Sequence, residues 1–395
     1  MKKWAILLAL MLLFSSAAAL ADSLYQLAAP HGFDMGAAIT YQQFHDQNYL
    51  NLVKQHFSTI TPTNELKAYT LLDQWGCRRS EDGMPVMNYR MADDMVAWAQ
   101  ENGIRVRGHV LVWDAYMCDW YFREGYDSSK PYADATTIQK RTKSYITQVI
   151  THFEEKFPGV VYCWDVVNEA VGDGITDYAP GDPRHLRTVR NGAPNLFQKY
   201  MGDDYVALSF LYARNAVEAL GADIDLYYND YNAYFNDKAL AMVQLARSVN
   251  NFAIDANGQP RKLMDGIGMQ GYIGGYGTQS GCLVNSHLQQ IKTAIQRYEA
   301  EGLKVQITEM AVRNFEKDRA QQHAEFYANL FEKFMSLHTE NGNPLNNVSI
   351  WGLIDYPKEP KGTYTYNLNS PYGGLFDEKL NEKEVLHAVC EQLKK

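Results

Sequence analysis

Between residues 161 and 169 the chain reads VYCWDVVNE, an apolar and aromatic run that ends in two polar side chains. Such a run is typical of a strand that is buried on both faces, with the polar pair at its carboxyl end. The same pattern recurs along the chain at intervals that leave room for a helix. The predicted strands are Phe33–Ala38, Phe57–Thr61, Ile104–Val110, Val161–Val167, Ile224–Tyr228, Gly266–Gln270, Lys304–Thr308 and Val348–Leu353.

The segments between these strands have helical patterning. Apolar residues recur at three- and four-residue spacing in 93–101, 204–220, 287–301 and 319–337. Strands that alternate with helices predict a parallel sheet, and eight repeats predict its closure into a (β/α)8 TIM barrel, an α/β fold. The chain has no linker rich in Pro, Ser or Thr, so we expect a single domain over residues 22–395.

The first residues predict export. Lys2 and Lys3 precede an apolar run over 4–14, and small residues follow as far as Ala21, in the pattern of a signal peptide over 1–21. The run is shorter than the roughly 20 residues that a membrane-spanning helix needs. We therefore expect a secreted protein, extracellular or periplasmic, with no membrane association after cleavage. A retained N-terminal anchor is the alternative.

Composition narrows the range of partners. The formal net charge of −9 argues against nucleic acid, because such a surface repels phosphate. The 27 Tyr and 7 Trp suit carbohydrate, since sugar rings stack on aromatic side chains. Without a Walker motif, a GxGxxG motif in the right context or a Cys/His cluster with zinc-site spacing, we expect no cofactor and no metal. We also expect a monomer, and the odd count of five Cys leaves at least one thiol unpaired or intermolecular.

Two glutamates occupy the carboxyl ends of predicted strands. Glu169 ends the run over 161–169, and Glu309 ends the run over 304–309. Cleavage of a glycosidic bond needs one carboxylic acid and one carboxylate, and a partly desolvated rim with a neighbouring carboxylate can keep one of them protonated. A single Glu in this position is more often a helix-cap neighbour or a surface ion pair. The pair, together with Asn168 as a donor to a sugar 2-hydroxyl, points instead to glycoside hydrolysis.

Seven motifs occur in order at the spacing of barrel strands: TPTNELK (61–67), GHVLVW (108–113), WDVVNE (164–169), YNDYN (228–232), GMQ (268–270), ITE (307–309) and WGLID (351–355). By these motifs the chain resembles the glycoside hydrolase family 10 xylanases over about residues 30–390. The resemblance implies a retaining endo-β-1,4-xylanase that cuts internal bonds of xylan by double displacement. It implies Glu169 as general acid/base and Glu309 as nucleophile, with carboxyl groups about 5–5.5 Å apart.

The resemblance also implies a substrate-binding shell. Asn64 and Lys67 match positions that hold the sugar two units toward the non-reducing end, while His109 and Trp351 match contacts to the sugar at the cleavage site. The residues that the family pattern and the 2-hydroxyl argument assign to this shell are Asn64, Lys67, His109, Trp113, Asn168, Gln270, Tyr272 and Trp351.

The chain departs from the family pattern at several positions. Thr63 stands where a Glu is usual, Asp114 where a His is usual, and Tyr272 in place of a His that bonds the nucleophile. A phenol can donate the same hydrogen bond but does not titrate near neutral pH, which predicts a flatter alkaline limb in the rate profile. The loop over 358–372 contains three Tyr and lacks the usual second Trp. Either a Tyr takes the place of that Trp, or the substrate-binding site is more open.

These departures favour one alternative to a xylanase, a clan relative that acts on another β-linked glycan or on aryl glycosides. A barrel that only binds glycans is a second alternative. It predicts a lost carboxylate, whereas both are present. The leading interpretation is an enzyme whose partner is xylan or xylo-oligosaccharides.

Overall fold

The computed structural model describes residues 23–273, 283–362, 364–366 and 370–395. The predicted signal peptide over 1–21 and Cys282 lie outside these ranges. In the described part of the chain, no helix is both long and apolar enough to cross a membrane.

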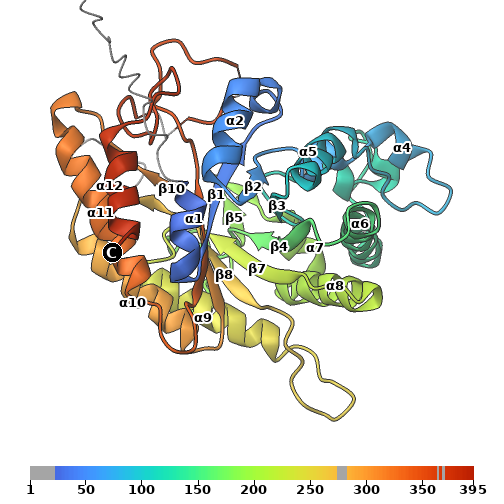
Figure 1. The fold of residues 1–395 in the computed structure, drawn as a ribbon. Coiled ribbons are helices and arrows are strands. Elements are labelled where there is room, and N and C mark those ends of the chain that lie inside the picture. Colours follow the sequence, from blue (N-terminus) through green and yellow to red (C-terminus); the bar gives the residue numbers. More distant parts are fainter. Residues whose placement is uncertain (1–22, 274–282, 363, 367–369) are drawn as a thin grey trace, which may run out of the picture.

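Eight parallel strands form a closed barrel at the centre of the described structure (Figure 1). Each strand pairs with the next along the chain, and the last strand pairs with the first, so this sheet has no open edge. All eight predicted strands are thereby confirmed. Their bounds are β1 Asp34–Ile39, β2 Thr59–Pro62, β3 Arg105–Gly108, β4 Val161–Asn168, β7 Asp225–Asp230, β8 Gly266–Met269, β10 Lys304–Val312 and β11 Leu345–Ile350.

Helices follow the strands and surround the barrel (Figure 1). The four segments predicted to be helical correspond to α5, α8, α10 and α11. The last helix, α12, lies beside α11 and brings the C-terminus back to the outside of the barrel. Within the described ranges the helices are α1 Leu24–Ala28, α2 Gln47–His56, α3 Ala68–Leu71, α4 Gln74–Arg78, α5 Arg90–Glu101, α6 Ala135–Lys156, α7 Leu196–Met201, α8 Tyr205–Leu220, α9 Asn236–Asn250, α10 Ser286–Glu299, α11 Ala320–Met335 and α12 Glu384–Leu393.

Local chemistry sets where several helices begin and end. Asp46 precedes α2, and its carboxylate accepts hydrogen bonds from the backbone N–H groups of Asn48 and Tyr49. Such an N-cap stabilises a helix by about 1 kcal/mol. At the C-terminal end of α8, Gly221 adopts a left-handed φ of 64°, which a glycine tolerates at little cost.

The barrel interior contains a buried ion pair. Arg107 on β3 makes a two-point contact with Asp165 on β4, and its Nε donates to Gln306 Oε1 on β10 at 2.7 Å. Arg107 and Asp165 are at most 1% exposed, so removal of one partner would leave the other as an uncompensated buried charge. The Arg107 side chain therefore ties together strands that are not neighbours in the sheet.

Two short elements extend this frame at the barrel mouth. The strands β5 (Val189–Arg190) and β6 (Ala193–Pro194) form an antiparallel hairpin. Its two loop residues, Asn191 and Gly192, have φ values of 50° and 79°, as a type I′ turn requires. The strand β9 (Tyr272–Ile273) pairs with the end of β10, at Ala311 and Val312.

Candidate active site

The two glutamates singled out in the sequence lie at the carboxyl ends of their strands. Glu169 directly follows β4, and Glu309 lies within β10. Their exposed fractions are 7% and 5%, so both carboxyl groups are largely withdrawn from water. In a TIM barrel this end of the strands carries the active site.

Glu309 is held by two hydrogen-bond donors. The Tyr272 hydroxyl donates to Oε2, and Asn229 Nδ2 donates to Oε1 at 3.1 Å. Burial, together with the negative charge of Glu169, raises the pKa of Glu309 to about 7, while the Tyr272 hydrogen bond and the Lys67 ammonium oppose the rise. The Tyr272 hydroxyl thus donates to the Glu309 carboxylate, the hydrogen bond that the sequence suggested a phenol could make here.

Glu169 is fixed through both its carboxylate and its backbone. Gln270 Nε2 donates to Oε1 at 3.0 Å, and Arg190 Nη1 donates to Oε2 at 2.9 Å. The residue has a left-handed φ of 55°, which is uncommon for a side chain of this kind and stores some strain. Its N–H donates to Asn229 O at 2.9 Å, and its carbonyl accepts from Arg187 Nε at 3.2 Å, so the surrounding structure holds this backbone in place.

A chain of amides connects the two carboxylates. Asn229 Nδ2 donates to Asn168 Oδ1 at 2.9 Å as well as to Glu309, and Gln270 Nε2 reaches the same Asn168 oxygen at 3.3 Å. In the described structure the Asn168 Nδ2 donor is buried and has no hydrogen-bond partner. A buried donor without a partner is costly, so this amide is available to an acceptor on a ligand.

His109 is neutral and oriented by Asp165. The distance between His109 Nδ1 and Asp165 Oδ2 is 2.7 Å. Burial lowers the pKa of His109 to about 4, even though the hydrogen bond and charge of Asp165 oppose this. A neutral ring that donates from Nδ1 leaves Nε2 as an acceptor. The centroids of the Trp113 and Trp351 rings lie 6.0 and 6.1 Å from that of His109.

Lys67 joins this aromatic group to the carboxylates. Its Nζ donates to Asn64 Oδ1 at 3.3 Å and lies 5.1 Å from the centroid of the Trp113 ring. Burial lowers the pKa of Lys67, and the charges of Glu309 and Glu169 oppose this change. The ten residues that the sequence pointed to thus form two contact groups, one around the carboxylates and one around His109, and the charge of Lys67 acts on both glutamates.

Two residues of this site, Asn229 and Arg190, were given no role from the sequence. Asn229 bridges Asn168 and Glu309, and its signals in the sequence were its place after a predicted strand and within the motif YNDYN (228–232). Arg190 bonds Glu169, and Asp114, whose replacement of the family His had no explanation, is the second partner of Arg190. The lost carboxylate at Thr63 is not replaced by Glu65, which accepts from the backbone N–H groups of Tyr41 and Asn64 instead.

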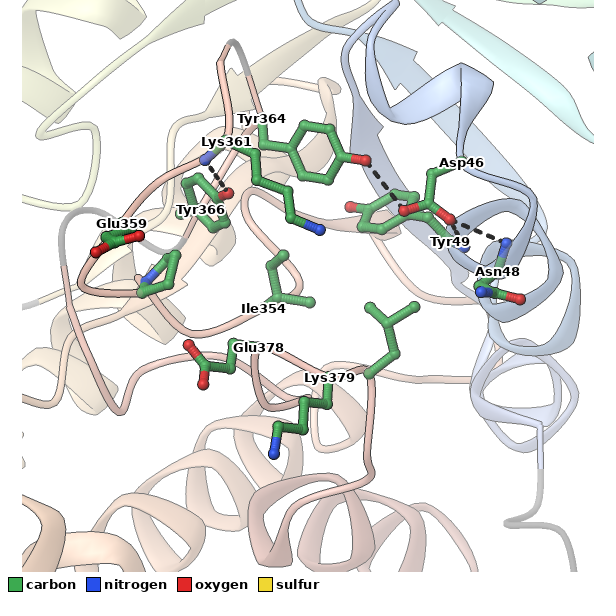
Figure 2. A pocket seen from close by; sticks show the side chains of 12 residues that line it. Asp46, Asn48, Tyr49, Ile354, Glu359, Lys361, Tyr364, Tyr366, Glu378 and Lys379 are labelled. Atoms are coloured by element: carbon green, nitrogen blue, oxygen red, sulfur yellow. Dashed lines mark hydrogen bonds between the residues drawn. The ribbon is translucent and has the colours of Figure 1, made fainter.

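Two of the three tyrosines of the loop over 358–372, Tyr364 and Tyr366, line a separate pocket. Figure 2 shows this pocket of about 420 Å³, which lies between α2 and the segments that follow β11. Tyr364 Oη donates to Asp46 Oδ2 at 3.0 Å, and Tyr366 Oη accepts from Lys361 N at 2.8 Å. None of the ten predicted site residues lines it.

In the described ranges, no group of three or more His, Cys, Asp or Glu side chains has an arrangement that could hold a metal ion.

The comparison with protein families decides the identity. A profile described as glycosyl hydrolase family 10 matches residues 23–392, nearly the whole chain. The chain belongs to glycosyl hydrolase family 10. The resemblance drawn from its motifs is therefore confirmed, and the family 10 protein is a glycoside hydrolase.

Individual relatives of this family 10 chain are xylanases by name. It is 34% identical over 301 residues to a putative endo-1,4-beta-xylanase from Caldicellulosiruptor saccharolyticus, covering 74% of this chain and 88% of the relative. It is 26% identical over 362 residues to endo-1,4-beta-xylanase B from Butyrivibrio fibrisolvens, covering 90% of this chain and 51% of the relative. The chain thus spans only about half the length of the second protein.

Solved structures agree with the fold. The Clostridium thermocellum endo-1,4-beta-D-xylanase with CBM22-1 and GH10 modules, complexed with xylohexaose, has a TM-score of 0.77 at 26% identity. The match covers 94% of this chain and 67% of that one. An intracellular xylanase from Thermoanaerobacterium saccharolyticum, solved as a mutant with xylotriose, has a TM-score of 0.71 at 26% identity and covers 94% and 99% of the two chains.

Proposed function

We propose that this family 10 protein is an endo-1,4-β-xylanase that cuts internal bonds of xylan with retention of anomeric configuration. The observation that carries the proposal is the pair of buried carboxylates, Glu169 and Glu309, linked by the amides of Asn168, Asn229 and Gln270. The names of the relatives support the substrate.

In the first step Glu309 attacks the anomeric carbon, and the glycosidic C–O bond breaks. Glu169 gives its proton to the departing oxygen, and a covalent glycosyl-enzyme forms at Glu309. In the second step Glu169, now a carboxylate, takes a proton from water, whose oxygen attacks the anomeric carbon and releases Glu309. The two carboxyl groups together hold one proton at the start, on Glu169 in the reactive form, and have it back at the end.

The Asn229 amide and the Tyr272 hydroxyl keep the Glu309 carboxylate oriented while it is the nucleophile. Two fixed donors reduce the reorganisation needed as charge moves to the sugar and back. The donor without a partner on Asn168 is suited to the 2-hydroxyl next to the reacting carbon, a contact that strengthens in the oxocarbenium-like transition state.

Sugar rings on either side of the scissile bond would meet two kinds of surface. Asn64 and Lys67 supply donors and an acceptor for vicinal hydroxyls, and the indoles of Trp113 and Trp351 supply apolar faces. Trp113 Nε1 is buried and has no hydrogen-bond partner in the described residues, so it offers one further donor. On sequence grounds we also propose export after removal of residues 1–21 and function as a monomer.

The test measures release of reducing sugar by the protein without residues 1–21 from xylan and from a soluble cellulose in parallel. Glu309→Ala removes the proposed nucleophile, and Glu391→Ala, at a side chain that is 70% exposed, is the matched control. Release from xylan alone, abolished only in Glu309→Ala, is expected. Equal or greater release from cellulose would refute the substrate assignment and favour the clan relative with another β-linked substrate.

The stereochemical part of the proposal needs a separate measurement. Proton NMR of the products in the first minutes of hydrolysis should show the β anomer before mutarotation, because two displacements restore the original configuration. Initial appearance of the α anomer would refute retention and with it the role of Glu309 as nucleophile.

A further inference from the structure

An ion-pair network that departs from the usual family pattern lies against Glu169. Arg190 ends β5, and the type I′ turn at Asn191 and Gly192 folds β6 back onto this strand. The hairpin brings a guanidinium, 21 residues further along the chain, to the Glu169 carboxylate. Asp114, the residue that replaces the family His, meets the same guanidinium from the loop after β3.

The contacts of Arg190 are numerous and well formed. Nε and Nη2 each donate to one Asp114 oxygen at 2.9 Å, a two-point contact that fixes the plane of the guanidinium. Nη1 donates to Glu169 Oε2, and Nη2 also donates to the Glu169 carbonyl, both at 2.9 Å. The side chains of Arg190 and Asp114 are 17% and 7% exposed, so water screens the network only partly.

Only one of these contacts depends on the protonation of Glu169. If the carboxylate takes up a proton, the bond to Oε2 weakens, but those to Asp114 and to the Glu169 carbonyl stay. Arg190 therefore has a fixed position in both charge states of Glu169. The guanidinium also keeps its charge: burial alone would lower the pKa of Arg190, but the hydrogen bond and charge of Asp114 and the charge of Glu169 raise it overall.

Other charged groups face Glu169 from neighbouring elements. In the described residues these are Arg190 and Lys67 as cations, Arg187 at its carbonyl, and the carboxyl groups of Asp114, Asp230 and Glu309. Among them Arg190 is the cation that donates a hydrogen bond directly to the Glu169 carboxylate. Its guanidinium is therefore the positive charge in direct contact with this carboxylate.

We propose that Arg190, braced by Asp114, is a positioning residue that holds the Glu169 carboxylate in place and favours its anionic form, and so sets the pH range in which the enzyme works. The inference rests on the proposed role of Glu169 as acid/base. A His at position 114 would titrate within the working range, whereas the Asp114–Arg190 pair supplies a constant field. The contact with Arg190 thus gives Asp114, which stands where the family has a His, a structural role beside Glu169.

The test compares kcat/KM on xylan at pH 9 and at pH 5 in Arg190→Gln and Arg190→Lys. An opposite charge this close shifts the titration of a carboxyl group by about 1–3 pH units. Because Arg190 is shared with Asp114 and partly exposed, we expect about one unit. Loss of the charge should therefore raise the ratio of kcat/KM at pH 9 to that at pH 5 by ~10-fold, and move the optimum up by about half a unit.

The Lys variant keeps a cation but not the two-point contact, so its kcat/KM should fall while its pH ratio stays near that of the wild type. Arg184→Gln is the matched control. Arg184 pairs with Asp182 in the same loop region, and its substitution removes the same charge from the protein. An equal loss of kcat/KM at every pH in Arg190→Gln would mean a purely structural role and would overturn the proposal.

Asp114→Asn keeps the guanidinium and gives the test if Arg190→Gln does not fold. Removal of that negative charge should lower the pH ratio, opposite in direction to Arg190→Gln, and an unchanged ratio would overturn the proposal. Glu169→Ala tests the acid/base role of Glu169 separately from the positioning role of Arg190. This variant should still hydrolyse an aryl β-xyloside with a good leaving group, and azide should accelerate the reaction. Failure there would refute the acid/base assignment itself, whatever the outcome at Arg190.

Discussion

Tyr272→Phe tests the hydrogen bond from this phenol to the Glu309 carboxylate. The substitution keeps the ring and deletes the hydroxyl that donates to Glu309 Oε2, which leaves Asn229 as the other donor to that carboxylate at 3.1 Å. Because the Tyr272 hydrogen bond lowers the pKa of Glu309, its loss should raise that pKa above about 7. The carboxylate must be anionic to attack, so this variant should be impaired chiefly at low pH.

The size of the effect follows from the strength of the bond. A hydrogen bond to a charged group contributes about 1.5–3 kcal/mol, and one pKa unit corresponds to about 1.4 kcal/mol. The pKa of Glu309 should therefore rise by about 1–2 units. At pH 5 the anionic fraction then falls ~10- to 100-fold, and kcat/KM with it. At pH 9 it stays within a few-fold of the wild type, because Glu309 is largely deprotonated there in both proteins.

The assay is kcat/KM on a soluble xylo-oligosaccharide between pH 4 and 10. Tyr132→Phe is the matched control, because it removes a tyrosine–carboxylate bond to Asp119, 2.8 Å in length, from an exposed position. Tyr272→His restores the residue usual in the family and should add a titration near pH 6.5 to the profile. A loss in Tyr272→Phe that is the same at all pH values would refute this reasoning. So would a wild-type alkaline limb with an apparent pKa near that of free His.

Three further predictions concern the frame of the site. Arg107→Met should lower the free energy of unfolding by about 3–5 kcal/mol in urea titrations, since it strands the buried charge of Asp165; a loss below about 1 kcal/mol would contradict this. Gly268→Ala should reduce kcat/KM at least ~10-fold with a normal fold by circular dichroism, because the added Cβ would lie 2.4 Å from Asn229 Oδ1 and displace a donor to Glu309. The pKa of His109 is about 4 in the folded protein, below that of a free His. As pH falls, this side chain therefore takes up a proton in the unfolded chain before it does so in the folded protein. Stability should therefore decrease from pH 6.5 to 4 by up to about 3 kcal/mol, and His109→Gln should flatten this part of the curve.

The alternation of buried strands and amphipathic helices was readable from the chain because it depends on local periodicity. The run over 161–167 became β4 with one residue added. Strand ends were less accurate, because partner strands decide them. Lys304–Thr308 continues to Val312 in β10, where β9 supplies a partner. The strand predicted at 348–353 lies at Leu345–Ile350 and ends before Gly352, whose φ is 88°.

The placement of the two carboxylates also followed from sequence. In a parallel barrel the carboxyl ends of all strands meet at one face, so a Glu at the end of the fourth and seventh strands must approach the same mouth. The amide bridge through Asn229 was within reach of the same argument, since that residue lies one position before the last residue of β7. Closure of the barrel therefore brings these strand-end residues together, and little further sequence information is needed to predict the site.

Only the tertiary structure decided how these carboxylates are tuned. Arg190 and Asp114 are 76 positions apart, and nothing in their local sequence indicates that the β5–β6 hairpin brings one to the other beside Glu169. The pKa of Glu309 likewise depends on burial and on a hydroxyl 37 positions away. Periodicity reports which face of a strand or helix is apolar, whereas an electrostatic interaction depends on distance and on the exclusion of water, and both of these arise only when the chain has folded.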